Sequence, residues 1–149
     1  MAIKINSRNL NKRRKINLLK TGRIARMVLR GLGAKEAELN IIFCSNQKIR
    51  AFNRQYLGID ASTDVIAFPP DKRMRIPGIT RRFLGDIAIS SDKAAENSAR
   101  YGTTKGVETA LYIIHGILHL SGYRDGTKAE KNIIRKKENE ILRKIAKIL

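Results

Sequence analysis

The chain has 149 residues with 42% hydrophobic and 30% charged side chains, a composition typical of one globular domain with a single core. No apolar run approaches the length of a membrane-spanning helix and the N-terminal residues lack the apolar core of a secretory signal, so we expect one cytoplasmic domain over residues 1–149. The 31 basic against 13 acidic residues give a net charge of +18, which favours a nucleic acid partner, although a charged surface that only serves solubility also fits.

The N-terminal part of the chain predicts a strand, a helix and a second strand. Residues 2–7 alternate apolar and polar side chains, and the basic run at residues 12–15 predicts a solvated loop or the start of a helix. From Ile16 onward, apolar residues recur at helical spacing until the Gly-Leu-Gly sequence at residues 31–33, which is a helix-ending signal. The apolar run at residues 38–45 is typical of a buried strand.

The chain has one cysteine, Cys44, which lies in this apolar run. A single cysteine excludes an intramolecular disulfide, and the apolar surroundings predict a buried strand residue rather than a nucleophile. Both features fit a reducing cytoplasm.

The middle of the chain predicts a helix followed by two strands. Ser45 is a favoured N-cap residue and predicts a helix over residues 47–57. Its apolar face contains Ile49, Phe52 and Tyr56. Residues 62–70 are β-rich and end in two prolines, residues 84–91 predict the next strand, and the basic segment at residues 71–82 predicts a loop between them.

The C-terminal part predicts three helices. Residues 90–92 form a capping sequence for a helix over residues 93–101. Apolar residues then recur at helical spacing over residues 107–118 until Gly122, and an amphipathic basic helix follows from Thr127. The order β, α, β, α, β, β, α, α, α predicts an α+β fold: a small mixed four-stranded sheet packed by about five helices.

The only two histidines, His115 and His119, lie four residues apart in one predicted helix. Residues at this spacing share one side of a helix, so both imidazoles can reach a single ion. A catalytic zinc takes three protein ligands and keeps one position for a water, whose pKa the metal lowers toward neutrality. Gly122 is placed to end the helix and reverse the chain, which allows the carboxylate of Asp125 to return to the ion. The sequence therefore predicts a metal site made of His115, His119 and Asp125.

An alternative interpretation is that the two histidines lie at the edge of the core and that Asp125 is an ordinary turn residue, because HxxxH is a short motif. A zinc peptidase is a further alternative. Gly116 stands where HExxH proteases carry the glutamate that serves as general base, and this difference argues against peptide hydrolysis.

Five stretches carry a family resemblance. Residues 115–125, HGILHLSGYRD, resemble the H-G-x-L-H-L-x-G-Y-D-H signature of the YbeY family of bacterial metal-dependent endoribonucleases. Residues 62–69 (STDVIAFP) resemble that family's T-D-V-L-S-F-P, and residues 84–90 (LGDIAIS) its L-G-D-I-x-I-S. Residues 53–60 (NRQYLGID) stand where the family has N-x-x-Y-R-x-x-D, and residues 137–142 (KENEIL) resemble its closing E-x-x-I-L segment.

The resemblance implies a small α+β fold, one zinc bound at the three signature histidine positions, and cleavage of single-stranded RNA. It also implies a role in the maturation of small-subunit (16S) ribosomal RNA and in ribosome quality control, with ribosomal RNA and the small ribosomal subunit as partners and no membrane. His115 and His119 carry over directly.

The chain departs from the family pattern at three positions. Asp125 occupies the third histidine position, and Arg124 replaces the aspartate before it. A carboxylate can bind zinc, but its negative charge makes the bound water less acidic than three neutral imidazoles would, which leaves the identity of the ion open. Leu57 stands where the family has an arginine that engages RNA, and Arg54, one helical turn earlier, is a candidate substitute.

Basic residues around the matching motifs are the candidate contacts to RNA phosphates: Arg54, Lys72, Arg73, Arg75, Arg81 and Arg82. Each one alone could equally be a solvated surface charge. Asp64 and Asp86 lie in the two strand motifs, where they either stabilise turns or approach the metal. No residue stands out as general base. The alternative function is a ribosome-associated RNA-binding factor whose metal site is weakened or structural.

Overall fold

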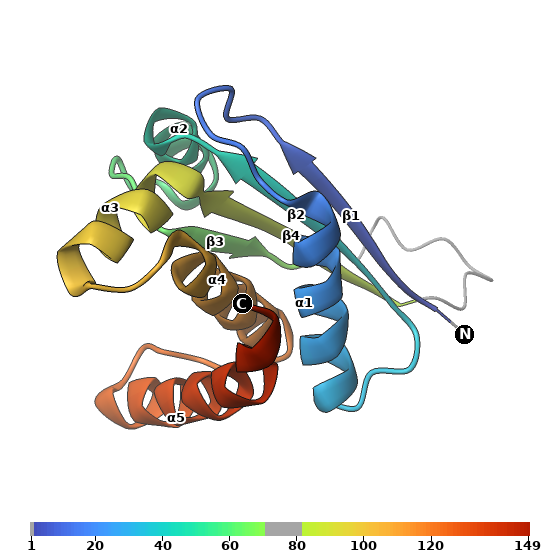
Figure 1. Ribbon diagram of the computed structural model, residues 1–149. Helices are drawn as coiled ribbons and strands as arrows, with labels where there is room; N and C mark the ends of the chain where they lie inside the picture. Colours follow the sequence, from blue (N-terminus) through green and yellow to red (C-terminus); the bar gives the residue numbers. More distant parts are fainter. Residues whose placement is uncertain (1, 71–81) are drawn as a thin grey trace.

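The computed structural model describes residues 2–70 and 82–149. The predicted order of strands and helices and the α+β fold are confirmed, and a short 3-10 helix, η2, extends the last helix (Figure 1). The elements are β1 (Ile3–Asn9), α1 (Leu18–Gly31), β2 (Ala37–Cys44), α2 (Asn46–Leu57), β3 (Val65–Phe68), β4 (Phe83–Ser90), α3 (Ser91–Tyr101), α4 (Lys105–Leu120), α5 (Lys128–Ile145) and η2 (Ala146–Ile148).

The four strands form one mixed sheet in the order β1-β2-β4-β3. β1, β2 and β4 are parallel, whereas β3 pairs with β4 in antiparallel orientation. Because a parallel pair needs a crossover, α1 connects β1 to β2. β3 is the last strand in this order and therefore an edge strand. Pro69 and Pro70, which cannot continue a ladder, follow its last residue.

The main core lies between one face of the sheet and the helices α1 and α4 (Figure 1). Side chains alternate along each strand, and the fully buried residues on this face include Leu39, Ile41, Phe43, Ile87 and Ile89. α5 packs against α4 and α1. The opposite face is covered in part by α2, whose Ile49 packs with residues of β2, β3 and β4 in a smaller cluster.

Cys44 belongs to this smaller cluster and is fully buried. Burial raises the pKa of its thiol to about 11, so the thiol stays protonated near neutral pH. The prediction of a structural cysteine is confirmed.

Gly116 brings α4 close to the sheet. A Cβ atom at this position would lie 2.8 Å from Cδ1 of Ile87 on β4, a distance that real Cβ contacts do not reach. Glycine therefore allows the helix that carries both histidines to pack directly on β4, one of the two inner strands.

The boundaries of some elements differ from the predicted ones. β1 extends two residues beyond the predicted Ser7, because Arg8 and Asn9 still pair with β2. α1 begins at Leu18 rather than Ile16, since the Asn17 side chain accepts a hydrogen bond from Lys20 N and caps the helix.

Helical spacing predicted that Tyr56 would lie on the buried face of α2 with Ile49, and the structure differs. The Tyr56 side chain is 60% exposed, and its ring lies edge-on to Phe68 with the ring centroids 5.5 Å apart. Helix α2 spans only part of this face of the sheet, so its last turn lies beyond the smaller cluster.

Candidate metal centre

Helix α4 positions both histidines at the border of its buried face. Its side chains from Ile113 to Leu118 pack in the core except that of His115, which together with His119 is partly exposed. The two imidazole rings are nearly perpendicular, with centroids 4.4 Å apart, and their Nε2 atoms lie 2.8 Å from each other. The predicted approach of the two rings on one side of the helix is confirmed.

The turn after α4 returns the chain toward these rings. Gly122 has φ +104°, a conformation that favours glycine, and its N–H donates to the carbonyl of His119. Tyr123 N donates to the carbonyl of Leu118, which completes a Schellman motif. This turn brings Asp125 back over the helix.

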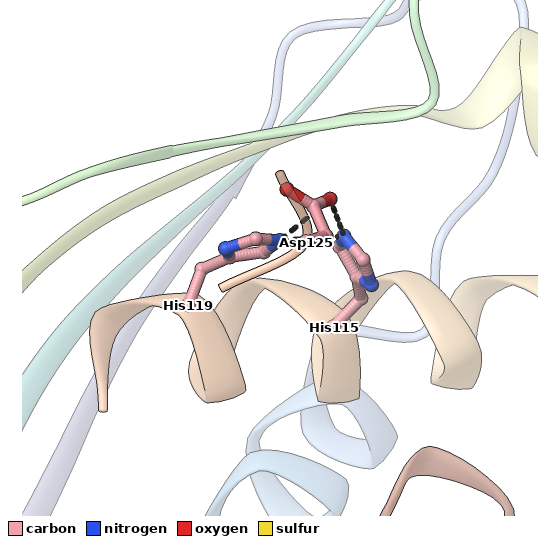
Figure 2. Close-up of side chains that lie close together, drawn as sticks. All are labelled: His115, His119 and Asp125. Carbon is pink, nitrogen blue, oxygen red and sulfur yellow. Dashed lines mark hydrogen bonds and ion pairs between the residues drawn. The ribbon is translucent and has the colours of Figure 1, made fainter. Parts of the chain in front are cut away.

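Asp125 completes a group of three convergent ligand atoms (Figure 2). Its Oδ2 lies 3.3 Å from Nε2 of His119 and 3.7 Å from Nε2 of His115. A tetrahedral zinc with bonds of about 2.0–2.1 Å requires ligand atoms about 3.3 Å apart. The three distances between ligand atoms are 2.8, 3.3 and 3.7 Å, which lie around this value. The donor set therefore fits a small divalent ion with little movement of the side chains.

Glu138 on α5 orients His115 from behind. Its carboxylate contacts Nδ1 of His115, and its side chain is only 16% exposed. Nδ1–H of the imidazole donates to the carboxylate, which leaves the lone pair of Nε2 directed at Asp125 and His119. The two Nε2 atoms are close enough to share one proton or one metal ion.

The sequence patterns did not identify Glu138, although it falls in the matching segment at residues 137–142. A signal was present: Glu138 follows Ile134 by four residues and precedes Ile141 by three, so a carboxylate interrupts the apolar stripe of α5. A largely buried carboxylate requires a partner, and the structure supplies His115.

The electrostatics of the site favour positive charge. Burial lowers the pKa of His115, but the hydrogen bond and the charge of Glu138, together with Asp64 and Asp125, outweigh burial and raise its pKa above the ordinary value. A site that stabilises a proton on imidazole also stabilises a metal ion, and the two compete for the same lone pair.

Asp64 and Asp86 have different positions relative to this site. Asp64 accepts hydrogen bonds from the hydroxyl of Thr63 and from Val65 N, at 3.2 and 2.8 Å, so it stabilises the start of β3. Its charge also contributes to the raised pKa of His115. Asp86 accepts from Nδ2 of Asn40 at 2.9 Å and alternates with Ile87, which faces α4, so it lies on the other face of the sheet.

Two of the six predicted RNA contacts lie among the described residues. Arg54 on α2 and Arg82, which precedes β4, are both exposed. The other four fall outside the described residues: Lys72, Arg73, Arg75 and Arg81. Leu57, at the family's arginine position, is the last residue of α2 and is 53% exposed.

An open hollow of about 370 Å³ is lined by the turn after α4 and by the start of α5. Arg124 lies on its wall, one residue before Asp125, together with Glu130 at the start of α5. The remaining lining residues are Ser121, Gly122, Tyr123 and Ile133. The hollow therefore offers an apolar surface with one basic and one acidic side chain, and its wall ends one residue before Asp125.

Known proteins similar to this chain agree with one another. A family model described as Endoribonuclease YbeY matches residues 5–146. A Pelotomaculum thermopropionicum protein is 38% identical over 122 residues, which cover 80% of each chain, and a Geobacillus kaustophilus protein is 40% identical over 111 residues, which cover 71% of each. Both are named Endoribonuclease YbeY. The solution structure of TM1509 from Thermotoga maritima has a similar fold, with a TM-score of 0.58 at 24% identity, covering 98% of this chain and 93% of that one.

Proposed function

The chain belongs to the YbeY endoribonuclease family, and from this premise we propose that it is a zinc-dependent, single-strand-specific endoribonuclease. An RNA-cleaving hydrolase is the activity that the family name specifies. The proposed role is maturation of small-subunit ribosomal RNA and ribosome quality control in the cytoplasm. The proposed domain is a single metallo-endoribonuclease domain over residues 1–149. A main core with residues from Ile3 to Leu149 supports this proposal.

The observation that carries this proposal is the convergence of His115, His119 and Asp125. Three ligands with space for a fourth are the donor set of catalytic zinc sites. The side chain of Asp125 is 47% exposed, so a substrate can reach the ligand atoms from solvent. A structural zinc site, in contrast, is closed by four protein ligands.

Different residues of the chain have different roles in the proposed reaction. Glu138 holds His115 in the tautomer that leaves Nε2 free to bind metal. A divalent metal held there would polarise a phosphoryl oxygen and lower the pKa of an attacking water. Arg54 and Arg82 supply positive charge for the RNA backbone, and Arg124 places a further cation next to the site.

Single-stranded RNA fits this arrangement better than a duplex. Unstacked bases can enter a hollow that has an apolar wall, whereas a base pair buries those surfaces. The hollow is apolar at Ile133, and its wall includes Arg124, the residue before Asp125 in the chain. A nucleotide that flanks the cleaved phosphodiester is the proposed occupant.

An RNA cleavage assay tests the proposed function. Purified protein is incubated with single-stranded RNA, with and without a chelator, beside His115→Ala and the surface variant Asn139→Ala as control. We expect the chelator and His115→Ala each to abolish cleavage, zinc to restore it after chelation, and Asn139→Ala to match the unmodified protein. Cleavage that persists in both the chelated and the His115→Ala samples would disprove the proposal.

The alternative, a ribosome-associated RNA-binding factor with a weakened metal site, is favoured by one observation. The apolar side chain of Leu57 is exposed where the family has an arginine. This function requires RNA binding without metal-dependent cleavage, so the same assay separates the two. Tight RNA binding with no cleavage at any zinc concentration would support it.

A further inference from the structure

The positive charge of this chain is concentrated at its N-terminal end. The first 35 residues include no aspartate or glutamate, and Glu36 is the first acidic residue. This segment forms β1, the loop after it and α1. Its eleven basic residues are Lys4, Arg8, Lys12, Arg13, Arg14, Lys15, Lys20, Arg23, Arg26, Arg30 and Lys35.

Among the described residues, most of these charges have no acidic partner. Arg14 forms an ion pair with Asp92, with 2.7 Å between Nε and Oδ1, and Nε of Arg26 donates to the carbonyl of Ile3. Within the described residues, no ion pair or side-chain hydrogen bond involves the exposed side chains of Lys12, Arg13, Lys15, Arg23 and Arg30. These cations are available to an external polyanion.

Helix α1 carries a row of like charges. Arg23, Arg26 and Arg30 are spaced by three and four residues, so they follow one side of the helix over about 10 Å. Like charges at these spacings repel each other and destabilise a helix. On α5, in contrast, Glu140 forms ion pairs with Lys137 and Lys144. The unbalanced row on α1 therefore costs stability unless a polyanion neutralises it.

The basic segment lies away from the metal centre. α1 packs against α4, and the imidazoles of His115 and His119 project from the opposite side of α4 (Figure 2). An RNA that contacts both regions has to extend around α4. A short oligonucleotide held at the metal ligands does not reach α1, whereas a long folded RNA can contact both.

We propose that the loop at residues 12–15 and the solvent-facing side of α1 form a second RNA-binding surface, which holds the phosphate backbone of a large RNA. The inference rests on the proposed function, because an endoribonuclease supplies RNA as the polyanion. Each phosphate contact releases counterions, so the surface binds through charge and without reading sequence. It selects large RNA over short fragments at the metal centre.

Salt-dependent binding tests this proposal. The variant Arg13→Gln/Arg23→Gln/Arg30→Gln is compared with Arg135→Gln/Lys136→Gln/Arg143→Gln, which removes three exposed charges from α5. Affinity for a long folded ribosomal RNA fragment and for a short single-stranded oligonucleotide is measured in chelator over a range of salt concentrations. Each lost phosphate contact reduces the slope of log K against log salt by about 0.7 to 0.9.

For the long RNA, we expect the first variant to reduce the magnitude of the slope of log K against log salt by about 2. Its binding and metal-dependent cleavage of the short oligonucleotide are expected to stay unchanged, and the α5 variant is expected to match the unmodified protein on both RNAs. An unchanged slope, or an equal loss in the α5 variant, would overturn the second surface. A loss of binding to anionic phospholipid vesicles with unchanged RNA binding would also overturn it, in favour of a membrane.

Two readouts keep this test independent of folding and of the proposed function. The variant Arg13→Gln/Lys15→Gln changes only the loop outside α1, and we expect it to lose part of the same slope. Cleavage of the short oligonucleotide by the unmodified protein reports the proposed function alone. If that cleavage is absent while the slope still depends on α1, the proposed enzyme fails and the binding surface stands.

Discussion

At the scale of single residues, the contact between the Glu138 carboxylate and Nδ1 of His115 orients the imidazole, and the sequence patterns did not identify it. Spacing along one helix places His115 and His119 together, and a glycine-dependent turn accounts for Asp125. Both signals are local. Glu138 lies on a different helix, and only the packing of α5 on α4 determines which side chain its carboxylate meets.

Replacing Glu138 tests its role in orienting His115. We expect Glu138→Gln to lower zinc affinity by about 10- to 100-fold, because the neutral amide holds the imidazole less firmly and makes Nε2 less basic. The measurement is a competition titration with a chromophoric chelator. Glu140→Gln makes the same charge change on an exposed residue of the same helix and should leave the affinity unaltered. Equal affinities in both variants would exclude Glu138 from the site.

The third ligand can be tested by two substitutions at one position. Asp125→Ala removes a ligand atom and is expected to lower zinc affinity at least about 10-fold, whereas Asp125→His restores the donor set of the family signature and is expected to preserve or strengthen binding. Isothermal titration calorimetry measures both. If Asp125→Ala binds zinc as tightly as the unmodified protein, Asp125 is not a ligand.

The raised pKa of His115 predicts opposite pH dependences with and without metal. In the metal-free protein, the group contributes stability below its unfolded-state pKa and loses it as pH rises through the higher folded-state pKa. Zinc requires the unprotonated Nε2, so the stabilisation by zinc grows with pH over the same range. Melting temperatures measured from pH 5 to 8 with and without zinc are expected to diverge as pH rises. Parallel curves would contradict this account.

At the scale of elements, the contact of α4 with β4 sets the position of both histidines. Helix starts are predictable from caps such as Ser45 and Ser90, since an N-cap is a local interaction. The length of β1 is not, because its last two residues are strand only through pairing with β2. The exposure of Tyr56 likewise depends on how far α2 extends over the sheet.

Gly116→Ala tests the close packing of α4. The added methyl group would lie 2.8 to 3.2 Å from three side-chain atoms of Ile87, so either Ile87 or the helix has to move. We expect a loss of about 1–3 kcal/mol in unfolding free energy, together with weaker zinc binding.

Gly106→Ala provides the control in the first turn of the same helix. Its nearest neighbour is Oγ1 of Thr104 at 3.8 Å, so the methyl group fits, and alanine should stabilise the helix by up to about 1 kcal/mol. Urea denaturation measures both changes. Equal effects at the two positions would mean that the contact with Ile87 does not constrain α4.

At the scale of the whole molecule, the fold is predictable because one apolar pattern dominates each element. The alternating strands and the three-four spacing of the helices require only that each apolar face be buried, and the main core with the smaller cluster under α2 satisfies this requirement. The high net charge predicts a polyanionic partner but not a location for it. That location follows from the absence of acidic residues before Glu36 and from the position of α1.

No helix among residues 2–70 and 82–149 has both the length and the apolar character to cross a membrane. The whole-molecule account rests on two proposals: that His115, His119 and Asp125 bind a divalent metal, and that α1 carries an RNA-binding basic surface.

The central claim is that His115, His119 and Asp125 bind a metal ion on which RNA cleavage depends. The most direct measurement is the zinc stoichiometry of chelator-treated protein without a histidine tag, by titration calorimetry beside His115→Ala. The account predicts one zinc per chain, a rise in melting temperature on binding, and neither effect in His115→Ala. Absence of stoichiometric zinc binding in the unmodified protein, or unchanged binding in the variant, would contradict it.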